Sequence, residues 1–475
     1  MTARDDSQPL AAFLALAAAV KLLVILAAGP GVSPDTAGYL EFTDAILKGW
    51  DAVTTVPWGS DVGLPSLVFR TAGYPLLLAG AKLLAGAHYQ YVVVAVQSAL
   101  TLLSMLMIFR LSRALLASDA AAWFVGVFYL FSQSLLYDVE ILSDSLYATL
   151  FNVVLFGTLG GLAGVWRLGV GRMALFGLLW GYSILVRENG LYFTVLPVLL
   201  LACGGRRAAL LIPVFLAAVA AVLAPYMLWN WQRTGEAFIS VAGAANWLRP
   251  GFHMLRFGYA NPFDGGDPVS QLVRQGMPDY EFGAQVTILE ALQRQLGLTP
   301  TRLQSYVFGR FVATVTEYPV AYLKMVLTQL RPFSLGSVLT DPAFTLNEFF
   351  QYGPVLGQRV LPGVSLKGAV AVFRDFSLGG MAGFLLAAAG LAVSTVLFFV
   401  FALGVPWWAV RVLRGRAPAD VRFGAALFGW ATFFTVVGAF CLVHFEMRHA
   451  LPAIPLALLG MAAVIREGRA KPSIA

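Results

Sequence analysis

The chain has 475 residues, of which 59% are hydrophobic and only 12% are charged. Soluble domains carry about 25% charged residues, so this composition excludes an ordinary soluble protein. The net charge of +7 does not indicate nucleic-acid binding, because the arginines are scattered between apolar runs, as orientation in a membrane requires. Two cysteines are too few for a disulfide framework.

Solid apolar runs recur along the chain, several of them near the ~20 residues that cross a ~30 Å hydrocarbon core. The first covers residues 10–28, and we interpret it as a retained span rather than a cleaved signal peptide. It contains Lys21, which we expect to snorkel toward the nearer interface. The later runs cover residues 89–109, 119–137, 142–164, 173–187, 190–204, 208–229, 381–409, 423–443 and 449–465. The predicted fold class is therefore an all-α polytopic membrane protein with about ten transmembrane helices.

Arginine clusters between the runs predict the orientation of the chain. If the short apolar run at residues 74–84 does not cross the membrane, the clusters follow alternate runs and fall on one side, which the positive-inside rule assigns to the cytoplasm. The clusters begin at Arg110, Arg167, Arg206, Arg411 and Arg466. We therefore expect a multi-pass protein of the bacterial inner membrane with both termini in the cytoplasm, and residues 74–84 as a partly inserted helix. The runs at 173–187 and 190–204 are short, and they form either a tilted hairpin or a re-entrant pair.

We predict three parts of the chain. Residues 1–230 form an N-terminal transmembrane module whose first outer loop, 29–70, begins with an interfacial helix at about 35–50. The Gly, Pro and Ser content of residues 56–66 predicts loop there. Residues 231–380 are too long for a structureless connection, so we expect an outer-face (periplasmic) cap with helices near 279–297 and 301–331. Residues 381–475 form the C-terminal transmembrane helices.

The predicted topology gathers acids and arginines at the outer mouths of the spans. Asp35 and Asp144 lie at two of these mouths, and Arg187 and Arg448 lie at two others. Arginine pairs bidentately with phosphate, and a carboxylate beside a hydroxyl can act as a general base. The pattern therefore favours a site that binds a phosphate and activates a hydroxyl, and we expect desolvation to raise the pKa of Asp35 toward useful basicity.

Each of these residues also has a structural interpretation. Asp35 and Asp144 stand where an N-cap of the following helix would stand. Arg187 and Arg448 have the positions of interfacial anchors. A set of aromatic residues after residue 230 has the composition of an interface belt rather than of a sugar platform.

For other polar residues on the outer side, the sequence gives weaker indications of a functional role. We expect Asp138 and Glu140 to be solvated loop acids. A metal site can be assembled on paper from His253, His444, Glu446 and His449. No metal-binding spacing such as HExxH is present, so we predict no metal site, and a divalent metal has no motif to support it.

Several stretches, taken in order, resemble bacterial polytopic glycosyltransferases of the GT-C type, the group that includes aminoarabinose transferase and protein O-mannosyltransferase-like enzymes. They are residues 33–39 with 47–49, then 70–75, 142–146, 185–190 and 446–452. The stretches cover most of the chain, and their placement relative to the spans matches the family.

The resemblance implies a hexosyl- or pentosyl-type glycosyltransferase that takes its sugar from a polyprenyl-phosphate donor and works on the outer face. It implies Asp35 as the catalytic carboxylate, with Arg187 and Arg448, joined by Lys48, as ligands of the donor phosphate. The acceptor would be an envelope lipid, glycan or protein. The expected partners are this donor, this acceptor and the lipid bilayer, with no nucleic acid, and the sequence does not fix the oligomeric state.

The chain departs from the family at one position. Many relatives have a second acid directly after the catalytic one, where this chain has Thr36, so the second acid is left to Asp144 or Glu41. The other residues that we expect to line the substrate site are Tyr39, Glu41, Arg70, Tyr74, Glu188, Asn189, Glu446 and His449.

A phosphate-linked sugar is already activated, and no P-loop or GxGxxG motif stands between a strand and a helix, so we expect no nucleotide cofactor. The alternatives from other classes are a transporter or flippase of lipid-linked sugars and a non-catalytic subunit of an envelope assembly. Transporters place ionisable groups near the middle of their spans and often have paired halves. Here the charged residues gather at one face, which favours the enzyme.

Overall fold

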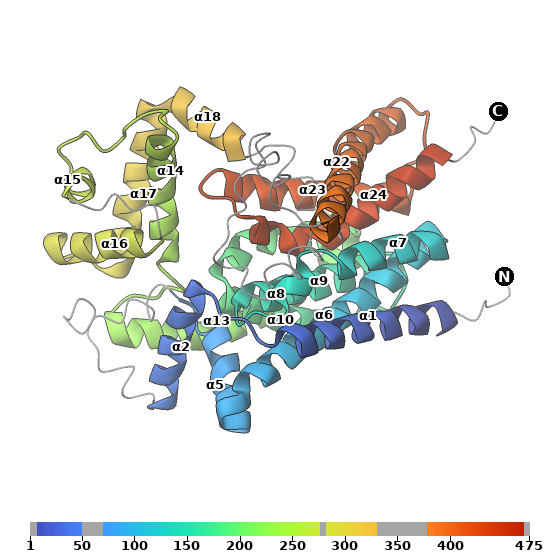
Figure 1. Ribbon diagram of the computed structural model, residues 1–475, viewed down its shortest axis with the longest axis horizontal. Helices are drawn as coiled ribbons and strands as arrows, with labels where there is room; N and C mark the ends of the chain where they lie inside the picture. Colours follow the sequence, from blue (N-terminus) through green and yellow to red (C-terminus); the bar gives the residue numbers. More distant parts are fainter. Residues whose placement is uncertain (1–6, 50–69, 276–281, 330–377, 470–475) are drawn as a thin grey trace.

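The computed structural model describes residues 7–49, 70–275, 282–329 and 378–469. Within these ranges the chain is helical apart from its turns and one isolated β-bridge (Figure 1). The loop predicted at 56–66 and much of the end of the predicted cap lie outside the described residues.

Seven helical segments in the described ranges are long and apolar enough to cross a membrane. They comprise α1 (Ser7–Ala28), α5 (Gly73–Ala85) continuing through η1 (Gly86–His88) into α6 (Tyr89–Leu116), α9 (Ser143–Leu162), α12 (Arg206–Ala209) with α13 (Ile212–Thr234), α22 (Leu378–Leu413), α23 (Val421–Cys441), and η4 (Met447–Ala453) with α24 (Ile454–Arg469). Shorter apolar helices are α7 (Asp119–Leu130), α10 (Val170–Val186), and η2 (Glu188–Thr194) with α11 (Val195–Cys203). Each coincides with one predicted crossing, except that the α5–α6 segment also takes in the run at 74–84, which was predicted as a partly inserted helix. The helices confirm the all-α polytopic fold class.

The outer surfaces of these helices carry large apolar side chains. Leu26 of α1 is 74% exposed, Leu84 of α5 is 83% exposed and Leu413 of α22 is 86% exposed. A soluble protein rarely exposes apolar residues on this scale, whereas lipid tails solvate them without cost. The protein is therefore a multi-pass membrane protein.

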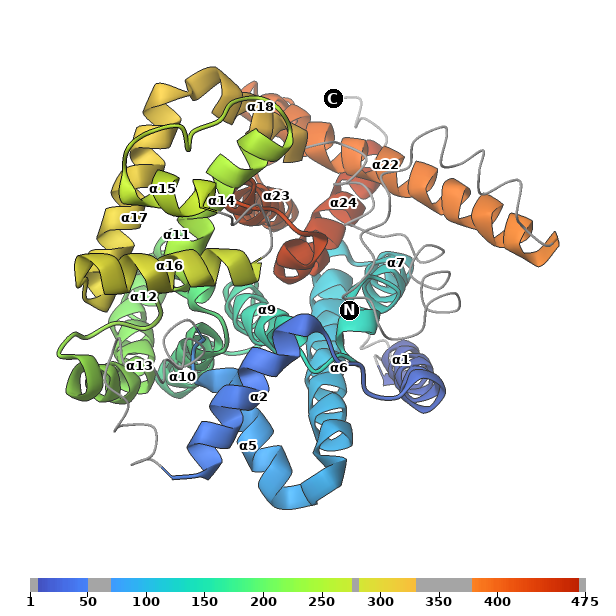
Figure 2. The ribbon, with the colours of Figure 1, turned by 60° about the vertical axis from the view of Figure 1, so that its left-hand side comes forward.

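Helix α9 is the centre of the bundle. In its most apolar stretch 89% of the residues are buried, and it packs against α6, α10, α11 and η4 (Figure 2). The polar side chains of Asp144, Thr149 and Asn152 on this helix are buried with it, so α9 is enclosed by protein and not by lipid. Its N-terminus, which carries Asp144, therefore lies among the ends of several other helices.

Helix α2 (Pro34–Leu47) follows the first span, where an interfacial helix was predicted, and it packs against α5. Helix α5 in turn meets α10 at Gly73, whose carbonyl accepts a hydrogen bond from Tyr182 Oη at 2.9 Å. A Cβ on Gly73 would lie 2.5 Å from the carbonyl carbon and oxygen of Leu185, so only glycine allows this approach.

The region after α13 forms a second, smaller apolar core beside the bundle (Figure 1). Its helices are α14 (Ala242–Arg256), α15 (Pro268–Arg274), α16 (Phe282–Leu296), α17 (Pro300–Glu317) and α18 (Pro319–Gln329). The pattern at 301–331 predicted one helix, and the structure has two, because proline at position 319 lacks the N–H that would continue α17.

Candidate active site

The first outer loop is tied to the turn before α9. Gly31 and Glu140 form a parallel β-bridge, in which the Gly31 N–H donates to the Val139 carbonyl and the Ile141 N–H donates to the Gly31 carbonyl, both at 2.8 Å. Thr36 Oγ1 donates to the Ile141 carbonyl at 2.9 Å. These bonds bring the N-termini of α2 and α9 together, although their residues are more than a hundred positions apart in sequence.

Asp35 is not the cap of α2. The N-cap residue is Ser33, whose backbone N–H donates to Thr36 Oγ1 at 2.9 Å, and Pro34 occupies the first turn. Thr36, the residue directly after Asp35, therefore caps the helix and fastens it to the turn before α9. The carboxylate of Asp35 is left to make other contacts, at a helix end that favours negative charge.

Arg70 and Arg448 hold the Asp35 carboxylate. Arg70 Nη2 donates to Oδ1 and Arg448 Nη1 donates to Oδ2, each at 2.9 Å. Burial acts to raise the pKa of Asp35, but the charges and hydrogen bonds of Arg70 and Arg448 outweigh it and lower the pKa to about 2. The prediction of a raised pKa was wrong for this state, because it counted desolvation and not the paired arginines.

Asp144 lies in the first turn of α9, and it is not the N-cap either, since Leu142 has that position. Its side chain is only 3% exposed, and it forms an ion pair with Arg187, the residue that ends α10. Its Oδ2 lies 3.9 Å from Arg448 Nη1, and no hydrogen bond to it was found among the described residues.

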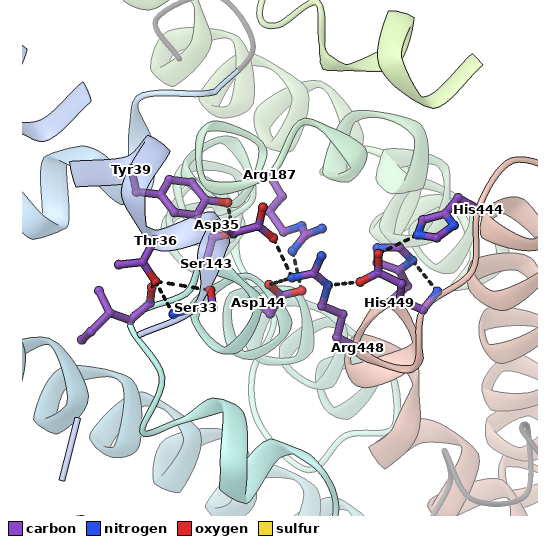
Figure 3. Close-up of polar contacts among 12 residues, drawn as sticks. Ser33, Asp35, Thr36, Tyr39, Ser143, Asp144, Arg187, His444, Arg448 and His449 are labelled. Carbon is purple, nitrogen blue, oxygen red and sulfur yellow. Dashed lines mark hydrogen bonds and ion pairs between the residues drawn. The ribbon is translucent and has the colours of Figure 1, made fainter. Parts of the chain in front are cut away.

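Arg448 lies within ion-pair distance of both Asp35 and Asp144 (Figure 3). Its guanidinium lies between Asp35 and Asp144, and on its other edge Nε lies 2.5 Å from Glu446 Oε2. The arginines predicted from separate spans thus gather around the predicted acids. The arrangement presents guanidinium groups to an anion, beside a carboxylate that is 27% exposed.

The other residues that we predicted from the sequence lie at different depths. The Tyr39 hydroxyl shares a 2.7 Å hydrogen bond with Ser143, and the Arg70 guanidinium stacks 4.6 Å from the Tyr39 ring centroid. Tyr74 is fully buried and donates to Gln97 at 2.9 Å, one layer behind Tyr39.

Lys48 and Glu41 are exposed on α2. Lys48 caps the far end of this helix, thirteen residues beyond Asp35, which is about 20 Å along the axis. The structure does not bring it to the other phosphate-ligand candidates.

Glu188 and Asn189 are half-buried in η2, directly after Arg187. Burial acts to lower the pKa of Arg70, but interactions with Tyr39, Asp35 and, to a smaller extent, Glu188 outweigh it and raise that pKa. His449 stacks on Phe440 with ring centroids 4.1 Å apart, and its Nδ1 accepts from the Glu446 N–H at 3.1 Å.

Asp138 and Glu140 are buried, 1% and 2% exposed, so the prediction of solvated loop acids was wrong. Asp138 forms an ion pair with Lys21, which is 3% exposed and does not snorkel to an interface. Thr101 Oγ1 also donates to Asp138, at 2.8 Å. The pair joins α1 to the core of the bundle, and sequence periodicity gives no signal for it.

Sequence reasoning missed Arg249 of α14, which lies 3.7 Å from Glu446. Within the described residues, no three His, Cys, Asp or Glu side chains are arranged to hold a metal ion. The residues of the hypothetical metal site instead bond to one another: His253 Nε2 lies 2.9 Å from His444 Nδ1, and His444 Nε2 lies 2.6 Å from Glu446 Oε1.

No known protein family and no curated protein matches the chain. Among solved structures, it is similar to the apo oligosaccharyltransferase of Archaeoglobus fulgidus, with 16% identity, a TM-score of 0.47, and coverage of 97% of this chain and 50% of that one. A complex of the same organism's oligosaccharyltransferase AglB with an inhibitory peptide and a dolichol-phosphate gives 16% identity, a TM-score of 0.46, and coverage of 96% and 50%. The chain spans half the length of these structures.

Proposed function

We propose that this protein is a glycosyltransferase of the GT-C type, which moves a sugar from a polyprenyl-phosphate donor to a hydroxyl of an envelope lipid, glycan or protein. One observation carries the proposal: Asp35 and Asp144 meet Arg70, Arg187 and Arg448 in one cluster at the ends of the spans. The ordered resemblance of the same stretches to GT-C enzymes supports it.

The cluster suits a phosphate delivered by the membrane. Arginine guanidinium groups bind phosphate oxygens with paired hydrogen bonds. Asp35, Asp144 and Glu446 pair with Arg70, Arg187 and Arg448 in this cluster, so a phosphate binds by taking the place of a carboxylate. Because α2 and α9 begin here beside the ends of apolar helices, a lipid-linked phosphate can reach the cluster from the bilayer.

The reaction then follows from the residues. The acceptor oxygen attacks the anomeric carbon from the face opposite the phosphate, and the carbon–oxygen bond to the phosphate breaks. The bonding electron pair leaves on the phosphate oxygen, where Arg187 and Arg448 stabilise the charge. Asp35 takes the proton of the acceptor hydroxyl as the new bond forms. The sugar is transferred with inversion.

Asp35 can act as a base only when its arginines have another partner. With Arg70 and Arg448 bound, its pKa of about 2 makes it a weak proton acceptor. A donor phosphate competes for the same guanidinium groups, which frees a carboxylate oxygen and removes the interactions that lower the pKa. Donor binding thus precedes activation of the acceptor. Asp144, buried beside Arg187, would hold that arginine in place and serve as the second acid of the site.

The test is transfer of a labelled sugar from a polyprenyl-phosphate donor by the purified protein in liposomes, with envelope lipids and glycans as acceptors. Asp35→Asn should reduce transfer by about 10²–10⁴-fold, the usual contribution of a general base. Asp44→Asn is the matched control: Asp44 lies on the same helix, is 54% exposed, and pairs with Lys82 outside the cluster. Near-normal transfer by Asp35→Asn would contradict the assignment.

The same liposomes separate the enzyme from its alternatives. A flippase would move the donor between leaflets without breaking its sugar–phosphate bond, and an assembly subunit would do neither. Donor translocation with no cleavage of that bond, for any acceptor offered, would overturn the proposal in favour of transport.

A further inference from the structure

The loop at residues 442–446, between α23 and η4, is held by helix α18. Tyr322 Oη donates to the Leu442 carbonyl at 2.8 Å, and Gln329 Oε1 accepts from the Phe445 N–H at 2.6 Å. One carbonyl and one N–H of the loop backbone are therefore bound by α18. This helix, remote in sequence, determines where the loop lies.

A chain of hydrogen bonds also runs from α14 into this loop. An ionised carboxylate only accepts hydrogen bonds, so His444 donates from Nε2 to Glu446 and accepts at Nδ1. His253 must then donate from Nε2 to His444, with its own Nδ1 unprotonated. Burial first, and then the neighbouring His444 and Arg249, lower the pKa of His253 to about 3, so it is neutral at physiological pH.

Glu446 is the junction between this chain and the candidate active site. Its carboxylate lies 2.6 Å from His444 Nε2, 2.5 Å from Arg448 Nε and 3.7 Å from Arg249 Nη1. Burial acts to raise the pKa of Glu446, but the charge of Arg448 and the hydrogen bond from His444 outweigh it and hold the pKa well below its usual range. Glu446 thus contacts Arg448 at Nε, whereas Asp35 contacts it at Nη1.

We infer that Glu446 is a positioning residue for Arg448, and that the His253–His444 pair aligns Glu446 from the region after α13. The Glu446 carboxylate forms an ion pair with Arg448 at Nε, without a hydrogen bond to that nitrogen, and its charge holds this edge of the guanidinium so that Nη1 faces Asp35 and the donor phosphate. The phosphate rests on the function proposed above, whereas the positioning contact is present without ligand. A long arginine side chain has many rotamers, and a shift of about 1 Å in a catalytic group costs on the order of 10²-fold in rate.

The first experiment compares transfer by Glu446 and Arg448 variants. Glu446→Gln should lower kcat about 10²-fold with a smaller change in KM. The Arg448→Lys background lacks the guanidinium that Glu446 orients, so Glu446→Gln should have little further effect there, because positioning acts only through Arg448. Full additivity of the two losses would overturn the inference.

The second experiment uses two substitutions of His444. His444→Gln keeps a donor N–H near the position of Nε2 and should retain most of the activity. His444→Phe keeps a ring but donates nothing, and should lose activity nearly as Glu446→Gln does. A merely structural role for the ring predicts the reverse order. His88→Gln, at an exposed histidine far from this chain in η1, is the control.

The third experiment needs no substrate, so it separates failure of this inference from failure of the proposed function. Phenylglyoxal labels arginines, and mass spectrometry reports the rate for each peptide. Glu446→Gln and His444→Phe should speed labelling of Arg448 several-fold, while exposed Arg414 serves as the reference. An unchanged rate at Arg448 would overturn the positioning role, whether or not the protein transfers sugar.

Discussion

Asp35 is ionised and paired before any donor arrives, and this sets the pH dependence of the reaction. A carboxylate with a pKa of about 2 stays charged as the pH falls from 7 to about 4, so the free protein keeps its base over this range. Once the donor phosphate takes the arginines, the pKa of Asp35 rises. The acid limb of kcat, which reports the complex, should therefore lie at higher pH than that of kcat/KM, which reports the free protein.

Both profiles can be measured between about pH 4 and pH 8 with a stable lipid-linked donor. The His444→Gln protein is the control. If the acid limb of kcat reports protonation of Asp35, this limb should lie at the same pH in His444→Gln as in the unchanged protein. If the acid limbs of kcat and kcat/KM lie at the same pH, the donor phosphate does not replace Asp35 as the partner of the arginines.

The ion pair of Lys21 with Asp138 makes a prediction about stability. Both side chains are buried, so Lys21→Met leaves an unpaired carboxylate among α1, α6 and α9. Loss of one partner of a buried pair costs about 3–5 kcal/mol. Thermal unfolding in detergent should show a large drop in Tm for Lys21→Met, and recovery of part of it in Lys21→Met with Asp138→Asn.

The exposed Lys324 of α18 gives the matched control, and Lys324→Met should leave Tm within the error of the measurement. A Lys21→Met protein as stable as the unchanged one would mean that Asp138 is neutral or solvated in the membrane, contrary to its burial.

Helices α5 and α10 meet at Gly73, and each adjoins an arginine of the site. Arg70 precedes α5, and Arg187 ends α10. Gly73→Ala would place a Cβ 2.5 Å from the backbone of Leu185, which cannot move aside as a side chain can. Overpacking of this kind costs about 1–3 kcal/mol, and it should spread the arginines apart, so both Tm and transfer should fall.

Gly80→Ala on the same helix is the control, because its Cβ meets nothing within 4 Å. Alanine is a better helix former than glycine by about 1 kcal/mol, so this variant should be as stable as the parent or more stable. If Gly73→Ala were as stable and as active as the parent, α5 and α10 could move apart without loss of stability or transfer, contrary to this prediction.

The helices were largely predictable because each long apolar run has one stable solution in a bilayer, as α9 and α13 illustrate. The contacts between helices were less predictable. The acids and arginines at span ends were correctly expected to meet, since topology alone places them on one side. Lys21 and Asp138, 117 residues apart, gave no such signal, because pairing inside a bundle depends on helix rotation. Arg249 was missed because α14 lies in a region without span-like patterning.

At the scale of the whole molecule, the orientation in the membrane is still a prediction. The cytoplasmic assignment of the arginine clusters places both termini inside and the region of α14–α18 outside. In a background with Cys203→Ser, cysteine at Arg414 should react with a membrane-impermeant maleimide only after the cells are opened. Cysteine at Asp264 should react in intact spheroplasts. Reversed labelling would place the candidate site on the cytoplasmic face.

The arginines around Asp35 and Asp144 are already neutralised by partners within the chain. Binding of an anion is therefore an exchange, in which a guanidinium gives up one carboxylate as it gains a phosphate. A small anion dissolved in water gains little from such a trade and should bind weakly. A phosphate anchored to a lipid is confined to two dimensions beside the cluster, and its high local concentration can drive the exchange. The protein would thus respond to phosphate that a lipid holds beside the cluster and not to phosphate dissolved in water.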